Sequence, residues 1–160
     1  MKPLDNQIQV KALTYAYKLL SYRPRSQQEL SQRLEKKGFP PEVVGDIIEY
    51  LKEKGYLNDE AFAWFWINSR LSAKPTGARR LRVELIKKGI ENSIIEQVLS
   101  QFKEHYNETD LAHEAGLRRL NVLQKDERLK EKIRNRLSGY LARHGFSYEI
   151  VREVLDRILR

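Results

Sequence analysis

Several features are missing from this chain of 160 residues, and each absence narrows the classes to which it can belong. It has no cysteine, which excludes disulfide bridges, thiolate metal ligands and a cysteine nucleophile. No apolar run approaches the roughly 18 residues that a membrane-spanning helix needs. The first nine residues have no apolar signal core, so we expect no export sequence. We therefore expect a protein of the reducing cytoplasm that does not enter the membrane.

Signatures of catalysis are also missing. The chain has no glycine-rich phosphate loop followed by lysine and no nucleophile elbow. The three histidines, His105, His113 and His144, do not recur at metal-ligand spacing. A metal-independent hydrolase would need a carboxylate pair with shifted pKa values, and the sequence offers no candidate pair. We expect no enzyme activity, no metal and no cofactor.

Charge is present in excess, with 30 basic and 22 acidic residues and a net charge of +8. A surplus of this sign favours an anionic partner such as nucleic acid, a nucleoprotein or an acidic protein face, although ordinary solubility is an alternative. The surplus is +3 in residues 1–58, +1 in 59–108 and +4 in 109–160. The near-neutral middle third still contains a local cluster of cations.

An internal repeat organises the chain around Gly38, Gly89 and Gly145. Counted from each glycine, apolar residues recur eight and four positions before it and five, six, nine, ten and thirteen positions after it. These intervals of three and four are helical. Glycine can take the left-handed conformation that closes a last helical turn. Each copy is therefore predicted to contain a helix, a glycine stop and a second helix.

Further helices are predicted ahead of each pair, over residues 11–21, 59–71 and 110–123. The third copy has five extra residues, which we expect to lengthen its middle helix to 127–144. No segment alternates as a half-buried strand would.

Capping residues support these boundaries. Ser26 followed by Glu29 has the pattern of a capping box, Pro41 suits a first helical position, and Ser147 can cap the last helix.

The sequence thus predicts an all-α fold of three tandem three-helix repeats in an elongated, curved array. The expected divisions are an extension at 1–10 and repeats at 11–58, 59–108 and 109–160. Stacked units of this kind present a long concave face that suits binding along another extended surface. We expect a monomer that acts by binding.

Two sets of cations need separate interpretations. The pairs that precede each glycine, such as Lys36-Lys37, are explained by the partly negative carbonyls of a helix C-terminus. A second set lies at the opposite end of a helix, where the dipole disfavours cations. Its members are Arg70, Lys74, Arg79, Arg80 and Arg82. We predict that these five residues contact phosphate or acidic side chains.

A secondary basic face follows in the third repeat, with Glu127 and Glu131 interleaved. Its members are Arg128, Lys130, Lys132, Arg134 and Arg136. A solvated helix surface explains this face as well as a binding role does. The aromatic run 62–66 could stack on nucleobases, but such density favours burial in the core.

Several of these motifs resemble the RecX family of bacterial regulators of the RecA recombinase. In the first repeat the resemblance rests on residues 21–26, on Glu29-Leu30 and on Lys37-Gly38-Phe39. In the second it rests on residues 55–60, Ser69-Arg70, Pro75, Gly77, Arg79-Arg80-Leu81, Glu84-Leu85 and Lys88-Gly89-Ile90. In the third it rests on residues 143–147, where His144 departs from the family pattern.

The resemblance implies three tandem three-helix repeats and a protein that binds RecA, chiefly as a filament on single-stranded DNA. It also implies that this binding limits filament growth and so depresses RecA's ATP hydrolysis and strand exchange. The alternative is a helical module that binds DNA directly, since paired helices with a glycine turn are similar to helix-turn-helix motifs. Tight, salt-dependent binding to naked DNA would favour that alternative. Weak direct DNA contact is compatible with either.

Overall fold

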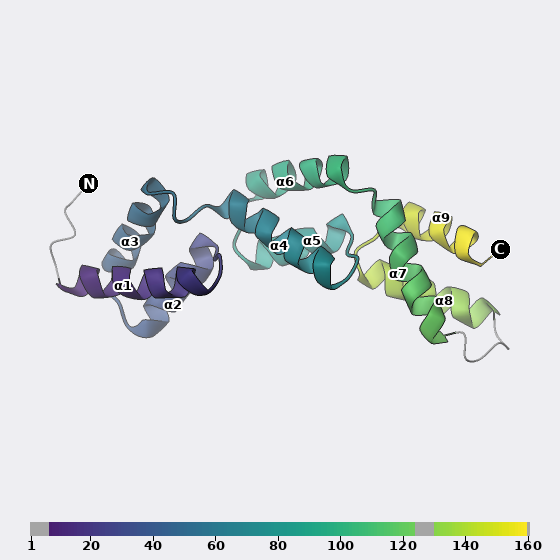
Figure 1. Ribbon diagram of the computed structural model, residues 1–160, viewed down its shortest axis with the longest axis horizontal. Coiled ribbons are helices and arrows are strands. Elements are labelled where there is room, and N and C mark those ends of the chain that lie inside the picture. The colour runs from purple at the N-terminus through teal and green to yellow at the C-terminus, as the bar shows by residue number, and fades with distance from the viewer. Residues whose placement is uncertain (1–6, 124–129, 160) are drawn as a thin grey trace.

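All regular elements in the described part of the chain, residues 7–123 and 130–159 of the computed structural model, are α-helices (Figure 1). They follow one another as α1 (Gln7–Tyr22), α2 (Gln27–Lys37), α3 (Pro41–Glu53), α4 (Asp59–Ala73), α5 (Ala78–Lys87), α6 (Asn92–His105), α7 (Glu108–Leu123), α8 (Lys130–Arg143) and α9 (Tyr148–Ile158). The predicted all-α class is confirmed. None of these described helices is long and apolar enough to cross a membrane.

The helix ends follow the predicted signals. The Ser26 hydroxyl accepts a hydrogen bond from the Glu29 amide at the start of α2, and Pro41 is the first residue of α3. Ser147 caps α9 through the Ile150 amide. A capping side chain or a left-handed glycine contacts only backbone groups within one turn of the helix end. The helix ends could therefore be predicted from neighbouring residues in the sequence.

The three repeat glycines have the predicted left-handed conformation. Their φ angles are 98° at Gly38, 74° at Gly89 and 89° at Gly145, just after the ends of α2, α5 and α8. A residue with a Cβ atom is strained at such angles, so the choice of glycine follows from the turn. The middle helices therefore stop where the repeat predicts.

Each group of three helices encloses its own hydrophobic core. Leu30, Leu34 and Ile47 are fully buried in the first core. Phe62, Leu85 and Phe102 lie in the second, and Leu137, Leu141 and Val154 in the third. The groups follow one another in an elongated row, with α1 and α9 at opposite ends (Figure 1). Three tandem three-helix repeats are confirmed.

The third repeat differs in its middle helix, as predicted. Helix α8 has 14 described residues, against 11 in α2 and 10 in α5. Residues 127–129 of the predicted helix lie outside the described residues.

Candidate binding surface

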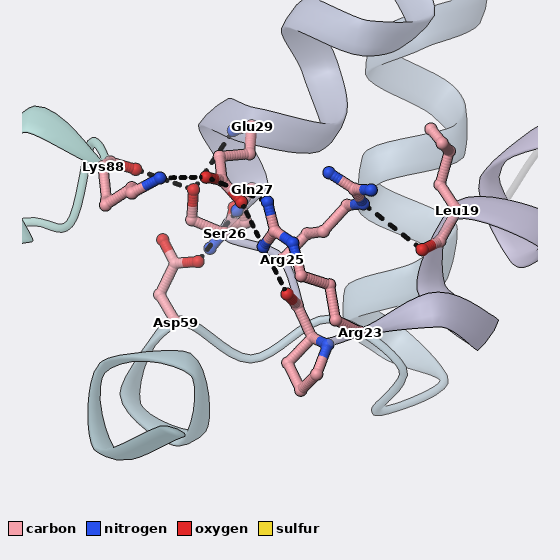
Figure 2. A network of polar contacts seen from close by, with 9 residues as sticks. Leu19, Arg23, Arg25, Ser26, Gln27, Glu29, Asp59 and Lys88 are labelled. Carbon is pink, nitrogen blue, oxygen red and sulfur yellow. Dashed lines mark hydrogen bonds and ion pairs between the residues drawn. The ribbon is translucent and has the colours of Figure 1, made fainter. Parts of the chain in front are cut away.

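The first and second repeats meet through a polar network (Figure 2). The Ser26 hydroxyl donates to the Lys88 carbonyl over 2.7 Å while it accepts from the Glu29 amide over 3.1 Å. The Glu29 carboxylate pairs with the Lys88 ammonium at 2.5 Å and with the Arg23 guanidinium at 3.0 Å. One capping residue and one carboxylate thus join the start of α2 to the end of α5.

The ionised state of Glu29 is favoured in this network. Burial alone would raise the pKa of the Glu29 carboxyl, but hydrogen bonds from Arg23 and Lys88 outweigh it and lower the pKa below its ordinary value. The Lys88 ammonium also lies 4.4 Å from the centre of the Trp66 ring. Its position is therefore set by an anion and by an aromatic face.

The second and third repeats meet in an equivalent way. The Gly77 amide donates to the His144 carbonyl over 2.8 Å. Ser26 and Gly77 both lie twelve residues before the glycine of their own repeat, and Lys88 and His144 both lie one residue before theirs. In both junctions the N-terminus of one middle helix abuts the C-terminal turn of the next.

A carboxylate supports each of these helix starts. Asp59, the first residue of α4, accepts from the Gln27 amide over 2.9 Å. Glu108, the first residue of α7, accepts from the Ala78 amide over 2.8 Å. Gln27 and Ala78 again occupy the same repeat position, eleven residues before the glycine. One free amide at the start of α2 and one at the start of α5 are therefore each satisfied by the acid that begins the first helix of the next three-helix group.

This junction gives Arg80 a role that sequence reasoning missed. The Arg80 guanidinium donates to the Arg143 carbonyl over 3.2 Å, and the Arg79 amide donates to the Gly145 carbonyl over 3.3 Å. A cation at the start of α5 is disfavoured by α5 itself, but it lies against the negative end of α8. The repeat alignment was the signal that could have revealed this contact.

Three of the five predicted contact residues have acidic partners in the chain. Arg70 and Arg80 share the Glu84 carboxylate, at 2.8 Å and 3.0 Å. Burial would raise the pKa of Glu84, but hydrogen bonds from Arg80 and Trp66 and the charge of Arg70 lower it. Arg82 pairs with Glu96 on the surface.

Lys74 and Arg79 differ from these three. Both are exposed, and within the described residues neither side chain has an ion pair. The Arg79 charge nevertheless helps to lower the pKa of Glu149, after hydrogen bonds from the Glu149 amide and from Ser147. The predicted cluster thus divides into three paired cations and two exposed cations.

Arg79 borders a shallow groove of about 410 Å³ where α5 meets α8. Its lining comprises Arg79, Arg80, Val83, Glu84, Lys87, Ala142, Arg143 and Gly145. Two apolar residues of α5, Val83 and Ile86, are 49% and 51% exposed. The surface of α5 therefore combines unpaired cations with accessible apolar area.

A second groove, of about 290 Å³, lies on the first repeat and was not predicted. Its lining comprises Arg23, Arg25, Glu29, Gln32, Arg33 and Lys36. Lys36 and Lys87 each lie two residues before their repeat glycine, so the two grooves share a helix position. Comparing the repeats for this shared cation could have revealed the first groove from sequence.

The predicted secondary basic face is only partly described. Lys132, Arg134 and Arg136 are exposed on α8, and Arg134 pairs with Asp156 at 2.7 Å. Lys130 is the first residue of α8. Arg128 lies outside the described residues.

The aromatic run of α4 is mainly structural. Phe62 is buried, while Trp64 and Trp66 are partly buried against the second core. The Trp64 indole donates to Gln101 and the Trp66 indole donates to Glu84. The prediction that this run packs in the core is confirmed for Phe62 and holds in part for the tryptophans. Over the described ranges, no group of three acidic or histidine side chains could hold a metal ion.

Comparison with known proteins identifies relatives for nearly the whole chain. Family models described as the first, second and third three-helix domains of RecX match residues 12–51, 58–99 and 107–155. The regulatory protein RecX of Chlorobium limicola is 34% identical over 150 residues, which cover 93% of this chain and 90% of that protein. That of Bacillus pumilus is 35% identical over 148 residues, covering 91% of this chain and 54% of the longer relative.

Solved structures share the fold. The crystal structure of RecX from Lactobacillus salivarius aligns with a TM-score of 0.80 at 21% identity, covering 94% of this chain and 96% of that one. A second structure described as regulatory protein RecX also aligns at 0.80, with 23% identity and coverage of 93% and 72%.

Proposed function

The chain belongs to the RecX family of regulatory proteins, and from this premise we propose that it binds the RecA recombinase. Its main target is RecA assembled as a filament on single-stranded DNA. Binding limits filament growth and so lowers RecA's ATP hydrolysis and strand exchange. The protein acts in the cytoplasm as a monomer, by binding alone and without a cofactor.

The observation that carries this proposal is the mixed character of the α5 surface. Arg79 and Lys87 supply exposed positive charge on the same helix as the exposed apolar side chains of Val83 and Ile86, and Lys74 adds exposed charge just before α5 begins. Contact with DNA phosphates alone would need only the cations. Apolar area next to cations suits a protein partner that carries acidic side chains. The surface therefore favours RecA over naked DNA as the main ligand.

The five predicted contact residues have different roles in this proposal. Lys74 and Arg79 meet the filament directly. Arg82 can exchange Glu96 for an acidic or phosphate group of the filament, because an exposed ion pair contributes only about 0–1 kcal/mol. Arg70 and Arg80 hold Glu84, and Arg80 also holds the junction with α8. Substituting Arg80 would disturb the fold as well as binding.

The test therefore spares Arg80. The variant Lys74→Ala/Arg79→Ala removes the two exposed cations, and Lys11→Ala/Lys18→Ala removes the same charge from exposed positions of α1. Inhibition of RecA's DNA-dependent ATP hydrolysis is titrated with each variant at two salt concentrations. Two exposed charge contacts of about 0.7 kcal/mol each predict about a tenfold higher inhibitory concentration for the first variant at low salt.

The control should inhibit like the parent. Because salt screens exposed charges, the difference between the two variants should shrink at the higher salt concentration. If both variants inhibit as the parent does, the α5 surface does not contact the filament and the assignment is wrong.

The secondary face on α8 extends this proposal. Lys132 and Arg136 are exposed without an ion pair among the described side chains, so they can add contacts along an extended filament. Lys132→Ala/Arg136→Ala should weaken inhibition less than the α5 variant does. Equal loss with both variants would instead indicate that the filament senses only net charge.

A further inference from the structure

The turn after α2 resembles the two turns at which the repeats join. The Gly38 amide donates to the Glu35 carbonyl and the Phe39 amide to the Leu34 carbonyl, at 2.9 Å and 3.2 Å. The end of α5 has the same two hydrogen bonds: the Gly89 amide donates to the Ile86 carbonyl over 2.9 Å, and the Ile90 amide donates to the Leu85 carbonyl over 3.1 Å. The backbone that receives a neighbouring helix in the second repeat is thus also formed in the first.

The surroundings of the two turns differ. A Cβ atom built at Gly89 would lie 1.8 Å from the Gln28 side-chain oxygen, and one at Gly145 would lie 2.4 Å from the Arg80 amide nitrogen. A Cβ atom at Gly38 would meet nothing within 4 Å. The Gly38 turn is therefore open in the described part of the chain, whereas the Gln28 side chain of α2 lies against the Gly89 turn and the start of α5 buries Gly145.

The side chains beside the open turn repeat the pattern of the first junction. The Lys37 ammonium lies 5.6 Å from the centre of the Tyr15 ring, as the Lys88 ammonium lies 4.4 Å from that of Trp66. Each lysine directly precedes its glycine, and each ring lies 23 residues before it. Lys37 is exposed and has no ion pair within the described residues.

The first junction shows what such a turn accepts. The helix that meets it begins with Ser26, whose hydroxyl donates to the Lys88 carbonyl, and carries Glu29 three residues later, whose carboxylate pairs with the Lys88 ammonium. The incoming helix brings the positive end of its dipole to the exposed carbonyls of the turn. Hydroxyl, carboxylate and dipole each have a matching group at the turn.

We propose that the turn formed by Lys37, Gly38 and Tyr15 is a docking surface for the N-terminus of a helix in a partner protein. That helix has a serine or threonine cap and a glutamate three residues later. A second copy of this chain fits less well, because α2 is the one helix with a described cap that begins in this way, and its start is already engaged. The surface is separate from α5 and is proposed independently of RecA binding.

The probe is a synthetic helical peptide that begins Ser-Ala-Ala-Glu and is cross-linked between side chains in its C-terminal half. A matched peptide begins Ala-Ala-Ala-Ala. Each is titrated into the uniformly ¹⁵N-labelled full-length chain, and amide shifts are followed by NMR. A single untethered junction predicts weak binding, in the range of about 0.1–1 mM or weaker, since the internal junctions gain from a high effective concentration.

We expect saturable shifts at Lys37, Gly38 and Phe39 with the first peptide, and at least fivefold weaker binding of the matched peptide. Lys37→Met, which keeps the side-chain stem and removes the charge, should also weaken binding at least fivefold. The control is Lys54→Met. Like Lys37, Lys54 precedes a glycine with positive φ (Gly55, 74°), and its ammonium lies 5.9 Å from the centre of a tyrosine ring, that of Tyr50. Unlike Lys37, its position is not one at which repeats join.

The control variant should bind the peptide as the parent does. The proposal is overturned if millimolar peptide shifts no amide of the turn, or if both peptides shift the same amides equally. Equal weakening by Lys37→Met and Lys54→Met would also overturn it, because the attraction would then be nonspecific. Retained amide dispersion in each variant confirms that it is folded.

Discussion

The junction between the second and third repeats can be tested by adding one methyl group. Gly145→Ala places a Cβ atom 2.4 Å from the backbone nitrogen of Arg80. Ordinary contacts begin near 3.4 Å, so the start of α5 must move by roughly 1 Å. Gly38→Ala is the matched change, because its φ of 98° imposes similar strain while nothing lies within 4 Å of the new atom.

The expected costs follow from these contacts. Left-handed strain costs about 1–2 kcal/mol at either glycine. At Gly145 the displacement also weakens the hydrogen bonds that Gly77 and Arg79 donate across the junction, which contribute about 1 kcal/mol each. We therefore expect the free energy of unfolding to fall by about 1–2 kcal/mol for Gly38→Ala and by about 3–4 kcal/mol for Gly145→Ala.

Urea unfolding followed by circular dichroism gives the overall change. Because the three cores are separate, native-state hydrogen exchange should be added: amides of α2 and α3 report on the first repeat, and those of α8 and α9 on the third. If Gly145→Ala is no more destabilising than Gly38→Ala, the contact between α5 and the α8 turn does not stabilise the array, and the reasoning fails.

Three further predictions concern the same junctions. Ser26→Ala should reduce the free energy of unfolding by about 2 kcal/mol, because a helix cap and a hydrogen bond to the Lys88 carbonyl are both lost. Ser147→Ala removes a cap and an exposed contact with Glu149 but no bond between repeats, and should cost about 1 kcal/mol; equal costs in urea titrations would contradict this. Gly89→Val should destabilise by about 1–2 kcal/mol through left-handed strain, with more expected from its contact with α2, and an unchanged melting midpoint would refute it. Burial, and then nearby cations, lower the pKa of His144, so the unfolded state gains its proton first as the pH falls. The free energy of unfolding should therefore decrease as the pH drops below about 6.5. His144→Gln should flatten the dependence of this free energy on pH between about pH 7.5 and 5.5, and an unchanged dependence would show that His144 does not cause it.

The helices, their ends and their threefold repetition could all be predicted from the order of the residues. Apolar intervals of three and four define a helix face, and a glycine or a serine cap acts within a single turn. These are interactions between residues close together in the chain. Gly38, Gly89 and Gly145 could therefore be placed at helix ends from the printed residues alone.

How the helix ends meet depends on contacts between residues that lie far apart in the chain. Ser26 bonds to Lys88 across 62 positions, and Arg80 bonds to Arg143 across 63. Local patterns do not encode which helix start covers which glycine turn, since that depends on how the separate cores stack. For this reason sequence reasoning regarded the five cations of the second repeat as equivalent. The folded chain pairs Arg70, Arg80 and Arg82 internally and leaves Lys74 and Arg79 exposed. The Arg80–Glu84 pair spans four residues of one helix and is a local contact, but only folding brings Glu84 within reach of Arg70, Glu96 within reach of Arg82 and the end of α8 within reach of Arg80.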